Sequence, residues 1–258
     1  MIELRHLALR ALATGDVPAK LAAVAAIAVD VALDCDGQID AADALPGRPV
    51  RPQLIAPKAV PPRGLGSVEG RAALIHALAH IEFNAINLAL DVVWRFAAMP
   101  PDFYREWMQV AREEAHHFSL LQAHLKTLGY DYGDFSAHNG LWEMAEKTKG
   151  DLLARLALVP RTLEARGLDV SPAIRQKLAS IGDPAGAAIL DVILRDEIGH
   201  VAVGNFWYRQ VCAQRGLDPL TTFATMAAIH NAPKQRGPFN VKARLAAGFE
   251  QAEIDALL

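Results

Sequence analysis

Four long stretches of the chain repeat apolar residues at spacings of three and four, and proline, glycine or other turn residues separate them. This spacing places the apolar side chains on one face of an α-helix. We expect these helices at about 67–99, 102–129, 141–166 and 183–216, with Ser67 and Asp102 as N-caps and Asp183-Pro184 opening the last. No period of two, which would indicate strands, extends over a useful length. The pattern predicts an all-α protein built around a four-helix bundle.

The segments outside the bundle have a different character. Residues 1–66 should form two short helices, the second at Val17–Leu33, followed by a proline-rich strap over 34–66 that packs on the bundle. Residues 67–216 form the bundle, and residues 217–258 form a tail of short helices, the whole making one structural unit. The strap and the tail segment 234–244 are basic, which suits either attraction of an anionic substrate or an ordinary solvated surface. The prolines of the strap are Pro46, Pro49, Pro52, Pro57, Pro61 and Pro62.

Composition excludes several classes of protein. A hydrophobic content of 52% in 258 residues is too high for a disordered chain, and a net charge of −3 argues against strong general nucleic-acid binding. Cys35 and Cys212 lack metal-ligand spacing and are expected to be ordinary thiols. No secretory signal is evident, and the apolar stretch Leu21–Leu33 is too short to cross a bilayer. We expect a soluble cytoplasmic protein with no membrane association.

Acidic residues occur on the apolar faces of the first two predicted long helices. Glu82 falls in the apolar stripe of the first, where an isolated carboxylate must become protonated, pair with a cation or bind a metal. The second helix contains Glu-x-x-His twice, because it carries Glu113-Glu114 and His116-His117. The helical period places Glu114 and His117 on the apolar face and the other pair on a wetter one. Glu114 and His117 are therefore the predicted inward pair.

The second half of the chain repeats this arrangement. Glu164 lies on the apolar face of the third predicted helix, and Glu197 with His200 forms a Glu-x-x-His on the fourth. The spacing from the lone Glu to the paired Glu is 32 residues in the first half and 33 in the second. For one such carboxylate an ion pair or an exposed position is the commoner explanation, but six matched residues favour a metal site. Four carboxylates and two imidazoles without thiolate suit two divalent cations, and they favour iron or manganese over structural zinc. The predicted ligands are Glu82, Glu114, His117, Glu164, Glu197 and His200.

These six residues resemble the ligands of the ferritin-like di-iron carboxylate superfamily, in which two helices each supply a Glu and two others a Glu-x-x-His. The segments HIEFNAINLALD (80–91), EAHHFSLL (114–121), PRTLEARGLD (160–169) and DEIGHV (196–201) are similar to a bacterial domain-of-unknown-function family near the tRNA-hydroxylase branch. The loop YGDFSAHNGLW (132–142) and the tail RGPFNVKARLAAGF (236–249) are similar to that family as well. The resemblance implies a ferritin-like fold with two iron ions, or manganese.

The expected activity is that of a non-haem di-iron, O₂-dependent hydroxylase or oxidase, with Glu114 and Glu197 as catalytic carboxylates. Its partners would be O₂, an electron donor and an unidentified small-molecule or RNA-derived substrate, and a homodimer is a further expectation. Two alternatives stay open. One is a ferroxidase or iron-handling protein, and the other is a non-catalytic protein with a structural metal pair.

A second polar stripe follows another face of the first long helix. We expect this stripe either to be solvated or to contact the strap, and we favour these explanations over a second functional site. Asp91 and Asp196 could orient ligand histidines, and Asp196 is the better candidate. His116 is expected either to be solvated or to contact a metal ligand without binding the metal itself. The stripe comprises His76, His80, Asn84, Asn87 and Asp91.

Overall fold

Helices account for all the regular elements in the described part of the chain apart from one isolated bridge, which confirms the all-α prediction. The computed structural model describes residues 3–41, 44–61 and 64–257, so Pro62 and Arg63 of the strap lie outside it. The chain divides into two units, residues 1–140 and 141–258. Each long helix hairpin groups with its own terminal elements in this division, and the three segments expected within one structural unit stay a prediction.

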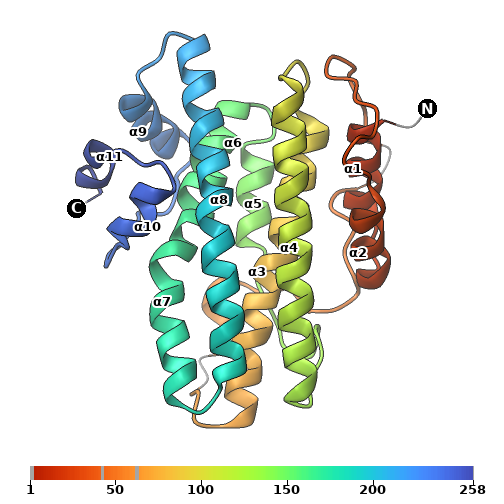
Figure 1. The fold of residues 1–258 in the computed structure, drawn as a ribbon, viewed down its shortest axis with the longest axis vertical. Coiled ribbons are helices and arrows are strands. Elements are labelled where there is room, and N and C mark those ends of the chain that lie inside the picture. The colour runs from red at the N-terminus through yellow and green to blue at the C-terminus, as the bar shows by residue number, and fades with distance from the viewer. Residues whose placement is uncertain (1–2, 42–43, 62–63, 258) are drawn as a thin grey trace. The chain divides into compact units, whose positions relative to one another are not determined.

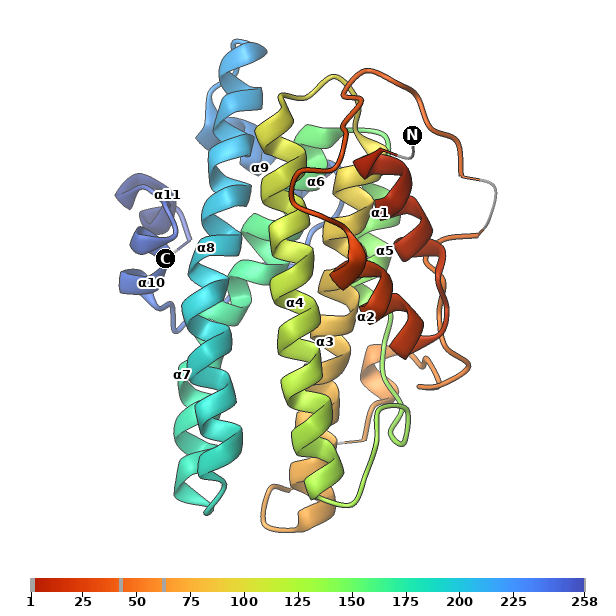
Figure 2. The same cartoon turned by 45° about the vertical axis from the view of Figure 1, so that its right-hand side comes forward.

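In the first unit, α3 (Val68–Arg95) packs along α4 (Pro101–Thr127), and α1 (Leu4–Ala13) and α2 (Val17–Ala26) lie against this pair (Figures 1 and 2). Ser67 caps α3 as predicted, since its hydroxyl accepts a hydrogen bond from the amide of Gly70. The N-cap of α4 is Pro100 rather than Asp102, because Pro101 already occupies the first helical position. Gly129, with a φ of +85°, follows the end of α4.

The predicted helix Val17–Leu33 is wrong in its second half, because α2 ends at Ala26. The carbonyl of Ile27 accepts a hydrogen bond from Arg112, and the carbonyl of Ala32 accepts one from the amide of Leu4. Tertiary partners therefore replace the helical hydrogen bonds that would have continued α2.

Over its described residues the strap is irregular, as predicted, except for one 3-10 turn, η1 (Pro57–Ala59), and one bridge. The bridge joins Leu54 to Ala137, so the strap runs beside the loop that follows α4. Arg48 of the strap donates a hydrogen bond to the side chain of Asn139 in the same loop. The loop after α4 is therefore held by hydrogen bonds to the strap.

Lys20 of α2 is fully buried, an unusual position for lysine. Its ammonium donates to the carbonyls of Ala11 and Leu12 at the end of α1, and to the side chain of Asn87 on α3 at 2.7 Å. This contact ties both N-terminal helices to α3. Burial, with a smaller contribution from Arg48, lowers the pKa of Lys20 to about 7.

Stability should consequently rise between about pH 7 and pH 10. In that range the unfolded chain binds a proton at Lys20 that the folded chain does not, so the free energy of unfolding increases with pH. We expect a gain on the order of 3 kcal/mol for the wild-type protein relative to Lys20→Met, measured by urea unfolding across this range. Parallel pH profiles for the two proteins would contradict the assignment.

The second unit begins with α5 (Gly140–Lys147) and α6 (Leu152–Leu158) and contains the hairpin of α7 (Ala165–Ser180) with α8 (Pro184–Gln214) (Figure 1). Three short helices follow, α9 (Pro219–Ile229), α10 (Val241–Ala246) and α11 (Gln251–Asp255). Asp183 caps α8 as predicted, and Gly216, with a φ of +65°, follows its end. The three helices α9, α10 and α11 confirm the prediction that short helices follow the last long helix.

The single helix expected over 141–166 is wrong. Residues Thr148–Asp151 interrupt it, Asp151 caps α6, and the helical path then continues beyond Gly167 to Ser180. Between α6 and α7 lies a π-helical segment, η2 (Val159–Glu164), which contains Pro160. The Thr162 hydroxyl donates to the carbonyl of Ala157, one of the groups in the disturbed ladder. A proline inside a helix disturbs the hydrogen-bond ladder, and a π segment is a known form of that disturbance.

Gly204 lets α8 approach this π segment. A Cβ at Gly204 would lie only 2.5 Å from the Cβ of Pro160, whereas a Cβ at Gly199 meets nothing within 4 Å. Gly204→Ala should destabilise the protein by about 1–3 kcal/mol because the two elements must separate. Gly199→Ala in the same helix should stabilise it by roughly 0.5–1 kcal/mol. Thermal unfolding of the two variants measures the difference, and equal effects would contradict this packing.

By length and composition, α3 could cross a membrane, a possibility that the shorter apolar stretch Leu21–Leu33 had not raised. However, 78% of its most apolar window is buried inside the structure. It also carries buried charged groups, including Glu82 and Asp91. These features are typical of a core helix in a soluble protein.

Candidate metal centre

Three of the predicted ligands meet in the core of the first unit. Glu82 comes from α3, and Glu114 and His117 come from one face of α4. The Nδ1 atom of His117 lies 3.3 Å from Oε2 of Glu114 and 3.4 Å from Oε2 of Glu82. Ligand atoms of all three lie within 4.8 Å of one another. These three side chains could hold a metal ion.

The two carboxylates act strongly on the imidazole. Burial by itself lowers the pKa of His117, but the hydrogen bonds and charges of Glu114 and Glu82 outweigh it and raise the pKa to about 11. The metal-free site therefore holds a proton on His117 at neutral pH, which offsets part of the negative charge. A metal ion that binds through Nδ1 would take over this role and release the proton. The group is thus built to hold a positive charge.

The predicted orientation of α4 is confirmed. Glu114 and His117 are both completely buried, whereas His116 is exposed and Glu113 accepts a hydrogen bond from Gln109 on the outer face. The helical period was therefore sufficient to separate the two overlapping Glu-x-x-His pairs.

The second unit brings one predicted pair together. Glu197 and His200 lie on the same face of α8, both are buried, and Nδ1 of His200 lies 3.5 Å from Oε1 of Glu197. Glu164 is the last residue of η2 and is only partly buried. Among the described residues, Glu82, Glu114, His117 and Glu197 are buried side chains that could hold a metal ion. The roles of Glu164 and His200 as ligands stay predictions.

The second polar stripe of α3 is buried rather than solvated, and the loop after α4 supplies many of its partners. His80 donates from Nε2 to the carbonyl of His138, and its Nδ1 accepts from the hydroxyl of Tyr132 at 2.8 Å. His76 stacks on Tyr132 and accepts a hydrogen bond from the amide of Gly133. Burial lowers the pKa of His80 to about 4, so this histidine stays neutral. Sequence reasoning missed this network, although two histidines one helical turn apart were its signal.

Arginines bind both carboxylates that were expected to orient ligand histidines. Asp91 is fully buried and contacts Arg95 at 2.6 Å, and Asp196 contacts Arg195 at 2.8 Å. Their effect on a ligand histidine stays a prediction.

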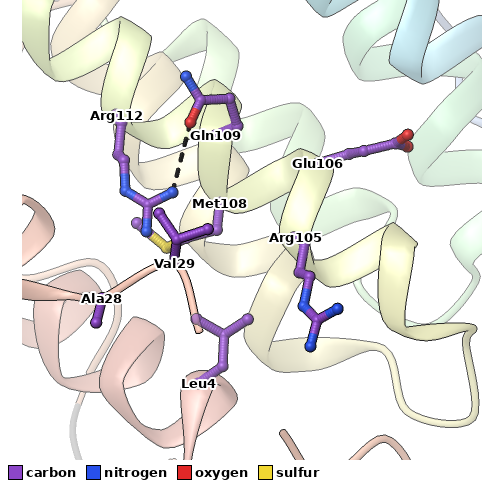
Figure 3. Close-up of a pocket in the computed structure, with 8 residues that line it drawn as sticks. All are labelled: Leu4, Ala28, Val29, Arg105, Glu106, Met108, Gln109 and Arg112. Carbon is purple, nitrogen blue, oxygen red and sulfur yellow. Dashed lines mark hydrogen bonds between the residues drawn. The ribbon is translucent and has the colours of Figure 1, made fainter. Parts of the chain in front are cut away.

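The first unit contains a cavity of about 230 Å³ between α4 and the N-terminal segments (Figure 3). Leu4, Val29 and Met108 form part of its wall, and Gln109 accepts a weak hydrogen bond of 3.5 Å from Arg112 at its side. None of the six predicted metal ligands lines this cavity.

Comparison with known proteins identifies the family. Residues 13–255 match a family described as "Protein of unknown function (DUF455)". An uncharacterised protein of Haemophilus influenzae is 52% identical over 214 residues, which cover 80% of this chain and 74% of that protein. No solved structure matches the chain. The family match extends over nearly the whole sequence, and the chain belongs to the DUF455 family.

Proposed function

We propose that this protein is a non-haem di-iron oxidoreductase, a hydroxylase or oxidase that uses O₂ on an organic substrate. The observation that carries the proposal is the buried convergence of Glu82, Glu114 and His117 in the first unit. The sequence repeats the same three residue types in the second half as Glu164, Glu197 and His200. We propose a dinuclear centre and a ferritin-like four-helix bundle, as these residue types and the resemblance imply.

The donor set fits iron or manganese. Buried oxygen and imidazole donors without thiolate favour these ions over structural zinc. Two carboxylates around one imidazole also concentrate negative charge, which a divalent cation would neutralise more completely than the proton on His117. When bound, iron would supply the O₂ chemistry.

The residues around the first-unit ligands would keep water away from the centre. Phe83 and Phe118 are buried with their ring centroids 5.5 Å apart, and Leu121 and Trp107 are buried on α4. A low-dielectric surrounding strengthens the interaction of the carboxylates with a cation. Glu114 and Glu197, as the carboxylates of the two Glu-x-x-His pairs, are the proposed catalytic residues.

O₂, an electron donor and a small-molecule or RNA-derived substrate are the proposed partners, and the proposed location is the cytoplasm. A homodimer is also proposed. The near-neutral net charge of −3 supports the absence of general nucleic-acid binding.

Metal analysis of protein reconstituted with Fe(II) under anaerobic conditions tests the proposal. We expect two iron ions per chain and a rapid change in the visible absorbance on mixing with O₂. Uptake of iron far beyond this ratio would identify an iron-handling protein. Bound zinc or manganese without any response to O₂ would favour a structural metal pair.

A further inference from the structure

A cavity of about 270 Å³ in the second unit is lined by η2, α9 and α11 and by the segments next to them. Its wall is mainly apolar and includes Leu220, Phe223, Ala224 and Phe249. Leu220 is 38% exposed, so the cavity opens to solvent. This volume is slightly below the usual range for ligand pockets and suits a small apolar group.

A buried cation lines this apolar cavity. Arg161 of η2 is 2% exposed and pairs with Glu253 of α11. Its guanidinium also lies 4.1 Å from the ring centroid of Tyr208 and 5.2 Å from that of Phe249. Among the described residues, its Nε and Nη1 atoms have no hydrogen-bond partner. Arg161 therefore keeps unused donors beside the cavity.

A second, basic cavity of about 230 Å³ adjoins the first, because Gln235 lines both and Arg161 and Thr162 are consecutive in η2. Three exposed cations line it, Arg166, Lys234 and Arg236. Its one carboxylate, Asp169, is already bound by Arg244 at 2.7 Å. The basic cavity therefore carries an excess of positive charge that attracts anions.

We propose that these adjoining cavities form one binding site for a small amphipathic anion, with an acidic group on the basic side and an apolar body beside Phe223 and Phe249. The basic tail segment 234–244 supplies Lys234, Gln235 and Arg236, which gives a specific role to a feature that the bundle does not explain. A bare anion would leave the apolar cavity unfilled, and an uncharged apolar molecule would not use the three cations. The site lies in the second unit and does not depend on a bound metal.

Binding of four probes to the full, metal-free chain tests the proposal by calorimetry at low ionic strength. Octyl phosphate should bind measurably, and octanol and inorganic phosphate should each bind at least about tenfold more weakly. Octyltrimethylammonium should not bind. The affinity for octyl phosphate should fall as salt is added, because the cations are exposed. Equal affinity for octyl phosphate and inorganic phosphate would overturn the proposal in favour of a simple anionic patch.

Two variants locate the site. Ala224→Trp, at an exposed position of α9, should fill the apolar cavity and abolish binding of octyl phosphate. The double variant Lys234→Glu and Arg236→Glu should weaken it about tenfold or more. Lys177→Glu, which reverses an exposed charge on α7 outside both cavities, is the control and should bind like wild type. Unchanged binding in Ala224→Trp, with a normal helical spectrum, would overturn the proposal.

Discussion

Glu114→Ala is expected to abolish metal binding by the reconstituted protein, and with it the response to O₂. Glu114 is completely buried, and its Oε2 lies 3.3 Å from Nδ1 of His117. No exposed side chain can therefore replace its carboxylate as a ligand. Loss of a residue that hydrogen-bonds to a metal ligand typically lowers the metal affinity about 10–100-fold. Loss of a ligand itself should lower the affinity further. Iron content after gel filtration and absorbance on mixing with O₂ are the two measurements.

Glu113→Ala is the matched control for this substitution. It removes the neighbouring carboxylate of the same helix, but that carboxylate belongs to the outer face and contacts Gln109. The control should retain its iron and its response to O₂. If Glu114→Ala also retained both, the assignment of Glu114 as a ligand would be wrong. Circular dichroism of both variants separates loss of metal from loss of folding.

Asp169→Ala is expected to produce the largest loss of stability in the second unit. Asp169 binds Arg244 through two hydrogen bonds of 3.0 and 2.7 Å, and both side chains are buried. It also accepts a hydrogen bond from the amide of Asn240, so it anchors α10 to α7. Removal of one partner leaves a buried charge without its counter-ion, which costs about 3–5 kcal/mol. Urea unfolding measures the change.

Arg175→Ala provides the comparison, because Arg175 and Asp191 form a similar ion pair between α7 and α8 that is about half exposed. Its loss should leave the unfolding midpoint nearly unchanged, since water already solvates both charges. The double variant Asp169→Ala with Arg244→Ala should lose less than the sum of the single losses. A wild-type midpoint for Asp169→Ala would show that this ion pair does not hold the tail in place.

Much of the local structure could be predicted, because it depends on neighbours in the sequence. Ser67 and Asp183 cap their helices through amides three residues away, and glycines at positive φ follow the ends of α4 and α8. The helical period also placed Glu114 and His117 inward and His116 outward. Burial on one face of a helix follows from the order of apolar residues, and the sequence contains that order.

Errors arose where distant groups satisfy the backbone or a charge. The end of α2 depends on Arg112 and on the amide of Leu4, neither of which a local pattern can indicate. The break before α6 is similar in kind, since Arg155 donates across it to the Thr148 hydroxyl and the carbonyl of Ala145. Local propensity gives no information on such partners.

The sequence by itself determined the all-helical class, the inward face of α4 and the residue types of the candidate metal centre. Tertiary structure decided which buried polar groups find partners. It buried Lys20 against the end of α1, joined His80 to Tyr132, and placed Arg161 among aromatic rings beside a cavity. The physical reason is that helical periodicity reports only on which side of a helix a residue lies. A buried polar group needs a specific partner at hydrogen-bonding distance, and chain topology alone brings that partner into place.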